Sequence, residues 1–515
     1  MTNQGSTKQL WREALALGAV FLLGAAVETS RTTSFFDPFD HSGFLDLFYR
    51  VYSGQKLYVD FFYNAGPVHA YIGAFFYWLL GPGISAVKAN ACMLSLFMAA
   101  YAYMLGRSSF GIPVSTALAT LATLFFVGPF SFPTYDHHAW LFLLLAIAFL
   151  RFDLSKNVVL NASLRGGICG TLIALSVLTK ANIGAFGAVI VAGVLILLPE
   201  RKRALMWLGL GFILCLNLVF FLLGTTFEFF QANFVEYAPG ARLTAWGLLN
   251  HLLHDIPYVP MAFGTVAIAL AGGRDYVVRE RRDFAILTGL IGTSIFSVWT
   301  SSMISDLNTF ALGLELVLLV VLVKRLPKGL PESPEYRLYR CCAVMLAGAC
   351  VLVFFTGIER TWRLGFFKSR LPSLEAVDYE IKSPPLKGWR CNHFYCEGMD
   401  EVVEFMRTHV PRQDSLFVFP DMQIIYQMTG HSSYLHAPYE FVLNILPGPG
   451  KPTTAFLNYF DANAPKWVVI HSISFLPNFD VDTGQQLKSL FLDEYFTKNY
   501  SHVWRGKYFT LLKHN

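Results

Sequence analysis

The feature that most constrains the fold of this chain is a series of apolar stretches between residues 10 and 355. Several are shorter than the roughly 20 residues that cross a bilayer, so flanking residues must extend them or neighbouring helices must shield them. Only 15% of the 515 residues are charged, against about 25% in a soluble protein. This composition excludes a soluble enzyme and a disordered chain, and it predicts a mainly α, polytopic bundle of membrane helices. The twelve apolar cores are 10–27, 66–80, 87–105, 112–127, 139–150, 166–179, 183–198, 204–223, 259–271, 284–298, 310–323 and 341–355.

Short basic runs between these cores predict the orientation of the chain. Lys and Arg gather at 201–203, 274–282 and 324–340, and such loops stay in the cytoplasm. The segment after residue 359 then lies outside, as does the loop 29–65 if the N-terminus is cytoplasmic. That arrangement needs an odd number of crossings, so we expect eleven or thirteen, with the uncertain crossing between residues 66 and 127. We interpret the first core as a retained anchor, because further membrane segments follow it.

The composition becomes mixed after residue 358. Short apolar strands are expected at 416–419, 467–470 and 508–512, with helical patterns at 399–410 and 487–499. Alternating strands and helices are typical of a small α/β domain. The predicted organisation is therefore a transmembrane domain of residues 1–358 followed by an external, soluble α/β domain of residues 359–515.

The first external loop, residues 29–65, carries the most informative pattern. Apolar side chains from Phe44 to Tyr52 recur at helical spacing, while Asp46 and Arg50 fall on other faces. The pattern predicts an amphipathic helix lying in the membrane interface, apolar side down, with Asp40 just before it. Taken alone, Asp40 is typical of a turn or a helix start.

The same loop resembles the first external loop of the GT-C superfamily of membrane glycosyltransferases, whose members include lipid A aminoarabinose transferases and protein O-mannosyltransferases. The resemblance covers the whole chain as architecture, but only residues 37–67 as motif. Its elements are an acidic residue, an amphipathic helix, a glycine, a Tyr-x-Asp-Phe segment and a proline-led entry into the next helix. In this chain they are Asp40, residues 44–52, Gly54, Tyr58-Val59-Asp60-Phe61 and Gly66-Pro67.

The resemblance implies transfer of a sugar from a polyprenyl-phosphate donor to an acceptor on the external face, with Asp40 as general base. The family has a lysine at a place similar to that of Lys180, which implies binding of the donor phosphate; taken alone, Lys180 is equally typical of a helix-end lysine that extends to the interface. Arg242 is a weaker candidate for the phosphate and is also typical of an ordinary surface arginine. His41 follows Asp40 where mannosyltransferase-type members often have Glu, and Gly66-Pro67 replaces their Pro-Pro. Both departures argue against a protein-mannosylating enzyme, but the acceptor stays open among lipid, glycan and protein.

Three further polar residues are candidates for the acceptor side of the site: Asp136 and His137 in a second external loop, and Asp60 in the first. A second interpretation is nearly as good: Asp136 and His137 are polar residues that cap a helix at the membrane interface. Two adjacent histidines point about 100° apart on a helix, so His137 and His138 are poor co-ligands and no metal site is assigned. A requirement for a divalent metal stays open.

Cys391 and Cys396 lie in polar sequence on the predicted external side, where oxidising conditions favour a disulfide. No firm cofactor is assigned; the polyprenyl-phosphate sugar is the expected donor substrate. The net charge of +5 is dispersed among loops, so nucleic acid is not an expected partner. The compact chain looks bacterial, which places it in the inner membrane with its active face towards the periplasm. The alternative functions are a multi-spanning transporter or lipid flippase, and a non-catalytic membrane scaffold.

Overall fold

The computed structural model of the chain consists of two compact units. Residues Met1–Thr29 and Ala91–Gly365 form the helical unit, and residues Ser30–Asn90 and Phe366–Asn515 form the loop–sheet unit. The predicted domain boundary after residue 358 lies outside the described residues and stays a prediction. The structure describes residues 3–32, 40–61, 63, 66–127, 132–151, 158–224, 258–300, 311–327, 348, 378–419, 422–434, 462–471 and 492–515.

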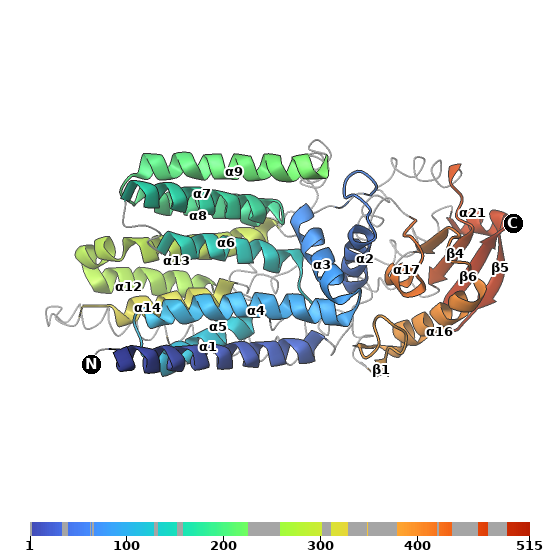
Figure 1. Cartoon of the computed structure of the whole chain (residues 1–515), viewed down its shortest axis with the longest axis horizontal. Coiled ribbons are helices and arrows are strands. Elements are labelled where there is room, and N and C mark those ends of the chain that lie inside the picture. Colours follow the sequence, from blue (N-terminus) through green and yellow to red (C-terminus); the bar gives the residue numbers. More distant parts are fainter. Residues whose placement is uncertain are drawn as a thin grey trace. The chain divides into compact units, whose positions relative to one another are not determined.

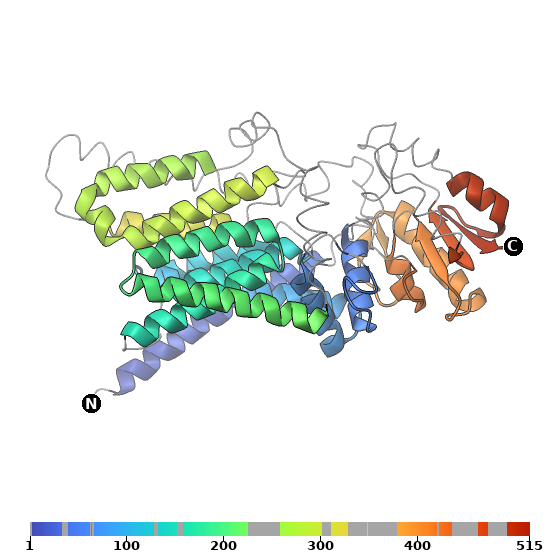
Figure 2. The same ribbon diagram turned by 90° about the horizontal axis from the view of Figure 1, so that it is seen from above.

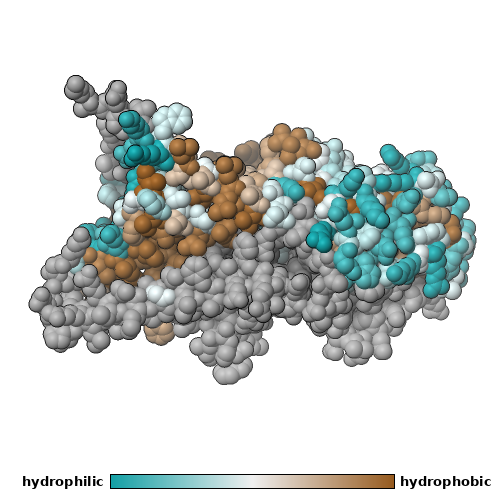
Figure 3. Space-filling model, turned by 90° about the horizontal axis from the view of Figure 1, so that it is seen from below, coloured by the Kyte–Doolittle hydropathy of each residue, from teal (hydrophilic) through white to brown (hydrophobic). Residues whose placement is uncertain are grey.

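The helical unit is a bundle of apolar helices that run side by side (Figures 1 and 2). Five helical segments in the described part are long and apolar enough to cross a membrane: Lys8–Val27, Ile84–Arg107, Leu160–Val177, Arg201–Leu223 and Met261–Arg279. On the face seen in Figure 3, the described side chains of the bundle are mainly apolar, and exposed Leu and Phe side chains such as Leu214, Leu218 and Phe221 lie on its helices. Its helices are α1 (Asn3–Thr32), α4 (Ile84–Arg107), α5 (Ile112–Val127), α6 (Tyr135–Arg151), α7 (Val158–Val177), α8 (Ala181–Ile196), α9 (Arg201–Leu223), α12 (Tyr258–Arg279), α13 (Arg281–Thr300) and α14 (Leu312–Lys324).

Small residues bring helices α7 and α9 into backbone contact. A Cβ atom added at Gly166 would lie 2.2 Å from the carbonyl oxygen of Ala204, and one added at Gly170 would lie 2.1 Å from that of Leu208. Glycine is the only residue that fits at such a distance. This close packing of small residues is typical of helix pairs in membranes, where the hydrophobic effect does not drive association.

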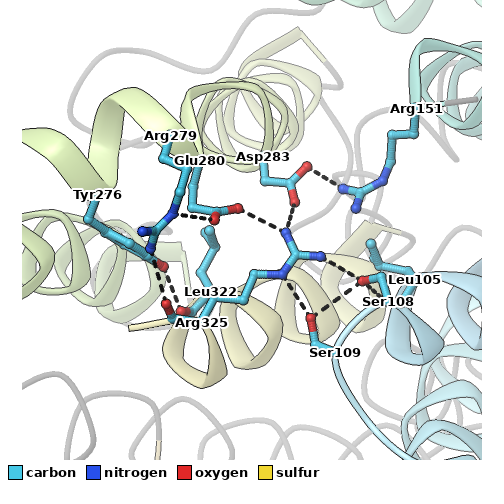
Figure 4. Close-up of polar contacts among 10 residues, drawn as sticks. All are labelled: Leu105, Ser108, Ser109, Arg151, Tyr276, Arg279, Glu280, Asp283, Leu322 and Arg325. Carbon is cyan, nitrogen blue, oxygen red and sulfur yellow. Dashed lines mark hydrogen bonds and ion pairs between the residues drawn. The ribbon is translucent and has the colours of Figure 1, made fainter. Parts of the chain in front are cut away.

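One end of the bundle is tied together by Arg325, which follows α14 (Figure 4). Its guanidinium donates to Glu280 and Asp283 at the α12–α13 junction, each at 2.9 Å, and to Ser108 and Ser109 after α4, each at 2.8 Å. Asp283 also pairs with Arg151 at the end of α6. These six residues form the Arg325 cluster. We call this end, which also contains the basic residues 201–203 and 274–282, the basic end of the bundle.

The N-terminal part of α1 belongs to the same basic end. Arg107 at the end of α4 donates to Glu13 at 2.8 Å, and further along, a Cβ at Gly24 would lie 3.5 Å from Ser95 of α4. Helices α1 and α4 are therefore antiparallel, with the end of α1 and the start of α4 at the opposite end of the bundle. Helix α6 starts at that opposite end near Asp136 and reaches Arg151 about 22 Å away.

The loop–sheet unit contains helix α2 from the first loop, helix α3 directly after that loop, and a small sheet from the C-terminal part. The four strands have the order β3-β4-β6-β5; β3 and β4 are parallel and the other neighbours are antiparallel. The expected strands are present, at Leu416–Phe419, Trp467–His471 and Phe509–His514. The elements are α2 (Asp40–Tyr52), α3 (Pro67–Leu80), β1 (Tyr379–Glu380), β2 (Arg390–Cys391), α16 (His393–His409), β3 (Leu416–Phe419), α17 (Ile424–Thr429), β4 (Trp467–His471), α21 (Leu492–Asn499), β5 (Tyr500–Arg505) and β6 (Phe509–His514).

Helix α2 is present where its periodicity predicts it, and its apolar face packs on α3. Phe48 covers Gly73 so closely that a Cβ there would lie 2.1 Å from the ring, and the rings of Phe48 and His69 meet edge to face with their centroids 5.0 Å apart. Helix α3 begins at Pro67, a residue favoured at the first position of a helix. It ends at Gly81, which has a positive φ of 80°.

The expectation of a solvated polar face on α2 is wrong. The side chains of Asp46 and Arg50 are buried, with relative exposures of 0% and 2%. The reason is that the C-terminal part of the unit, through α17 and the segment that follows it, covers the face opposite α3. Helix α2 is thus enclosed on both sides.

Candidate functional site

Asp40, the expected general base, is the first residue of α2. Its side chain lies outside the described residues, so the structure fixes its place on the helix and no contact of its carboxylate. That place at a helix N-terminus favours a negative charge, because unpaired backbone N–H groups are directed towards it. Asp37 lies outside the described residues altogether.

Contacts with the C-terminal part hold the helix that carries Asp40. The hydroxyl of Ser42 accepts a hydrogen bond from the backbone N–H of Ile424 at 3.0 Å. Asp46 accepts one from Arg50 Nε at 2.7 Å, and the hydroxyl of Ser433 donates to its other oxygen. A buried pair with these additional bonds leaves α2 one well-defined position against the sheet.

His41 lies directly after Asp40 and is buried against Trp389, with ring centroids 5.8 Å apart. Desolvation by burial lowers the pKa of His41 to about 3. The imidazole is therefore neutral at physiological pH. The residue that follows Asp40 in the sequence is thus a neutral ring packed on Trp389.

Lys180 and Asp136 are brought together in the helical unit. The ammonium of Lys180 donates to Asp136 at 2.6 Å and lies 4.9 Å from the centroid of the Tyr135 ring. Asp136 is in the first turn of α6, and Lys180 directly precedes α8. The pair lies at the end of the bundle opposite the Arg325 cluster. The Lys180 side chain keeps 17% exposure, against 4% for Asp136.

The other predicted site residues lie in different settings. His137 is buried; its Nδ1 accepts a hydrogen bond from the backbone N–H of Thr134 at 3.0 Å, which fits a cap at the start of α6. Asp60 is exposed and accepts from the N–H of Lys56 at 2.6 Å, closing the turn after α2. Arg242 lies outside the described residues. His431, in the C-terminal part, is buried and contacts Thr429 and the carbonyl of Pro411.

Glu315 is a candidate that the sequence analysis missed. It lies in the first turn of α14, is fully buried, and accepts a hydrogen bond from Ser294 of α13 at 3.0 Å. Within the described part of the chain, its Oε2 has no hydrogen-bond partner. The signal was a single carboxylate inside the apolar stretch 310–323, and ionisable residues inside membrane segments are commonly functional. Glu315 lies at the same end of the bundle as Asp136.

Cys391 and Cys396 form a disulfide that links β2 to the first turn of α16. Among the residues that the structure describes, no group of three or more His, Cys, Asp or Glu side chains is arranged to hold a metal ion. The candidate residues of the helical unit are Asp136, Lys180 and Glu315, and that of the loop–sheet unit is Asp40.

Comparison with known proteins identifies the fold. No family model and no curated protein matches the chain. Among solved structures, ArnT from Cupriavidus metallidurans bound to undecaprenyl phosphate matches with a TM-score of 0.58 and 14% identity over 97% of both chains. The same protein in its apo state matches with a TM-score of 0.54 and 15% identity over 98% of both chains. The chain therefore has the fold of ArnT, the fold expected from the resemblance of its first loop to the GT-C membrane glycosyltransferases.

Proposed function

We propose that this protein is a GT-C membrane glycosyltransferase that moves a sugar from a polyprenyl-phosphate donor to a lipid, glycan or protein acceptor. The observation that supports this most is the ArnT fold over nearly the whole chain, because the matching ArnT structure holds undecaprenyl phosphate. The motif of the first loop, with Asp40 at the start of α2, supports the same function independently.

In the proposed reaction, the carboxylate of Asp40 accepts the proton of the acceptor hydroxyl. The acceptor oxygen attacks the anomeric carbon, and the bond from that carbon to the phosphate oxygen breaks. The polyprenyl phosphate leaves with the electron pair, so no general acid is required. Enclosure of α2 by α3 and α17 supports this role, because a base must be held in position to act.

Lys180 is proposed to stabilise the departing phosphate. Its ammonium is held by Asp136 and lies beside the Tyr135 ring, and the pair is part-buried, where a charge interaction is stronger than in water. Asp136 thus orients the lysine as well as serving as the candidate acid of the second loop. Glu315, at the same end of the bundle, is proposed to contact a polar group of the sugar or acceptor.

We further propose eleven crossings, with the Asp136 end of the bundle outside. The end of α1 and the start of α4 lie at one end of the helical unit, so the chain between them crosses an even number of times. Helix α3 lies in that interval, and at 14 residues it is about 21 Å long, shorter than the 30 Å hydrocarbon layer. If α3, which is the apolar core 66–80, does not cross, eleven of the twelve cores remain as crossings. The basic end, with residues 201–203 and 274–282, is then cytoplasmic.

The test is sugar transfer in membranes of a bacterial host that lacks transferases of this kind. A radiolabelled pool of polyprenyl-phosphate sugars serves as donor, with expression of each variant measured. Asp40→Asn keeps the size of the side chain and removes the base, so transfer should fall by about 10² to 10⁴, the usual contribution of a general base. Asp37→Asn, in the same loop, is the matched control and should retain transfer.

Full activity of Asp40→Asn would assign the base to another residue, with Asp136 next to be tested. Transfer by none of the proteins, with several donors supplied, would favour the transporter alternative.

A further inference from the structure

A groove on the outer surface of the helical unit lies between α7 and α9, away from the candidate site. Its volume is about 690 Å³. Residues at helical spacing on α7 form one wall, including Leu164, Ile168 and Leu172, and Trp207 of α9 forms the other. Leu164 is 41% exposed, so this wall faces away from the core of the bundle.

The packing of the two helices explains why a groove forms here. The glycines of α7 bring the backbones into contact along one line, and the helix surfaces diverge on either side of it. Gly167 leaves the floor open: a Cβ added there would have only the Trp207 ring within 4 Å, at 3.9 Å. The groove is thus a consequence of a close glycine contact beside larger side chains.

The length and position of the groove match one membrane leaflet. On α7 it extends from Leu160 to Leu172, about 18 Å along the axis, and half of a 30 Å hydrocarbon layer is about 15 Å. These residues form the first part of α7, and Trp207 is in the first two turns of α9. Both helices start at the basic end, so the groove lies in the leaflet on that side.

A cation lies at the mouth of the groove. Arg203 lines it, is exposed, and has no ion-pair or hydrogen-bond partner among the residues that the structure describes. Arg201 and Lys202 precede it at the start of α9. An apolar groove of leaflet length that ends at a basic surface fits a molecule with a hydrocarbon chain and an anionic head.

We propose that this groove binds an anionic phospholipid of the leaflet at the basic end, with an acyl chain along α7 and its phosphate at Arg203. The site is distinct from the donor site of the proposed function, which lies at the opposite end of the bundle. The lipid would cover the exposed apolar wall of α7 and neutralise part of the charge at the start of α9.

The experiment uses Trp207 as its reporter. The full chain is placed in nanodiscs of phosphatidylcholine that contain either brominated phosphatidylglycerol or the same amount of brominated phosphatidylcholine. The fluorescence of the wild type minus that of Trp207→Phe isolates the signal of Trp207. Brominated phosphatidylglycerol should quench this signal more strongly than brominated phosphatidylcholine, by roughly fivefold in binding ratio, the effect of one basic residue near an anionic lipid.

Two pairs of variants test the two parts of the groove. Arg203→Gln should remove the preference for phosphatidylglycerol, while Lys202→Gln, which changes the neighbouring charge outside the groove, should keep it. Gly167→Leu should fill the groove and reduce quenching by both lipids. Gly209→Leu is its control on α9, because a Cβ at Gly209 meets no atom within 4 Å. The thermal midpoint of each variant confirms that it is folded.

Equal quenching by the two lipids would overturn the proposal and leave only ordinary lipid contact. An unchanged preference in Arg203→Gln would place the anion elsewhere and overturn it as well. Absence of quenching by either lipid would show that another protein surface covers the groove. None of these results depends on sugar transfer, so the proposal and the proposed function fail independently.

Discussion

Burial gives His41 a pH dependence that an exposed histidine would not have. Its pKa is about 3 in the folded chain and about 6.5 when unfolded. Because the folded pKa is the lower one, the unfolded state takes up the proton first as the pH falls. The contribution of His41 to stability is therefore complete above pH 6.5 and is lost progressively down to pH 3. Between pH 6.5 and 4.5 the loss is about 2 kcal/mol, because the slope rises from half to nearly all of 1.36 kcal/mol per pH unit over this range.

The measurement is the thermal midpoint of wild type and His41→Phe in detergent across this range. The wild type should lose more stability on acidification than the variant. His409→Phe, at an exposed position, is the control and should follow the wild type. Parallel curves for wild type and His41→Phe would show that His41 is not the group protonated on unfolding.

At the residue scale, the sequence places a few charged residues in or beside apolar membrane segments, where such residues are unusual. Asp136 and Lys180 were assigned separately, and their ion pair could not be predicted because 44 residues separate them. Glu315 carried the same signal within one apolar stretch and was overlooked. The side chain of Asp40 lies outside the described residues, so its proposed role as the base rests on the motif and on its place on α2.

At the element scale, the periodicity of α2 located its helix and its apolar face, but not what covers the other face. Asp46 and Arg50 look solvated in the local sequence, because a polar face normally meets water. What covers this face is distant in sequence: Asp46 accepts a hydrogen bond from Ser433, 387 positions away. A local pattern contains no information about such a contact.

Replacing one member of the buried pair in α2 should destabilise the loop–sheet unit strongly. Arg50→Met leaves Asp46 charged and buried without its partner, which costs about 3 to 5 kcal/mol. The free energy of unfolding, measured by denaturant titration of the full chain, is expected to fall by that amount. Lys56→Met removes an exposed cation a few residues away and should change it by less than about 0.5 kcal/mol.

The double variant Asp46→Leu with Arg50→Met then separates packing from charge. Because it removes both charges, it should recover much of the stability lost in Arg50→Met. If the double variant is as unstable as the sum of the two single variants, the pair is not coupled, and the enclosure of α2 rests on apolar packing alone.

At the scale of the whole molecule, the apolar cores and basic runs predicted a helical membrane protein, and the ArnT fold confirms that class. Strands β3, β4 and β6 were also located, since short apolar runs between turn signals identify them. The grouping of residues 30–90 with 366–515 was not predictable, because it depends on tertiary contacts between distant segments. The same limitation left the crossing number open: apolar length alone cannot tell a short helix that crosses from one that stays on a single side.

The position of Pro82, between α3 and α4, distinguishes these two possibilities for α3. If α3 does not cross, both of its ends lie outside; if it crosses, Pro82 is cytoplasmic. Pro82→Cys is made in a chain whose cysteines other than Cys391 and Cys396 are replaced by serine, and intact cells are treated with a membrane-impermeant maleimide. Lys56→Cys is the external control and Lys202→Cys, at the basic end, the cytoplasmic one. Eleven crossings predict that Pro82→Cys is labelled in intact cells, as Lys56→Cys is. Labelling only after permeabilisation, as with Lys202→Cys, would show that α3 crosses the membrane. One more segment before the C-terminal part would then have to cross as well.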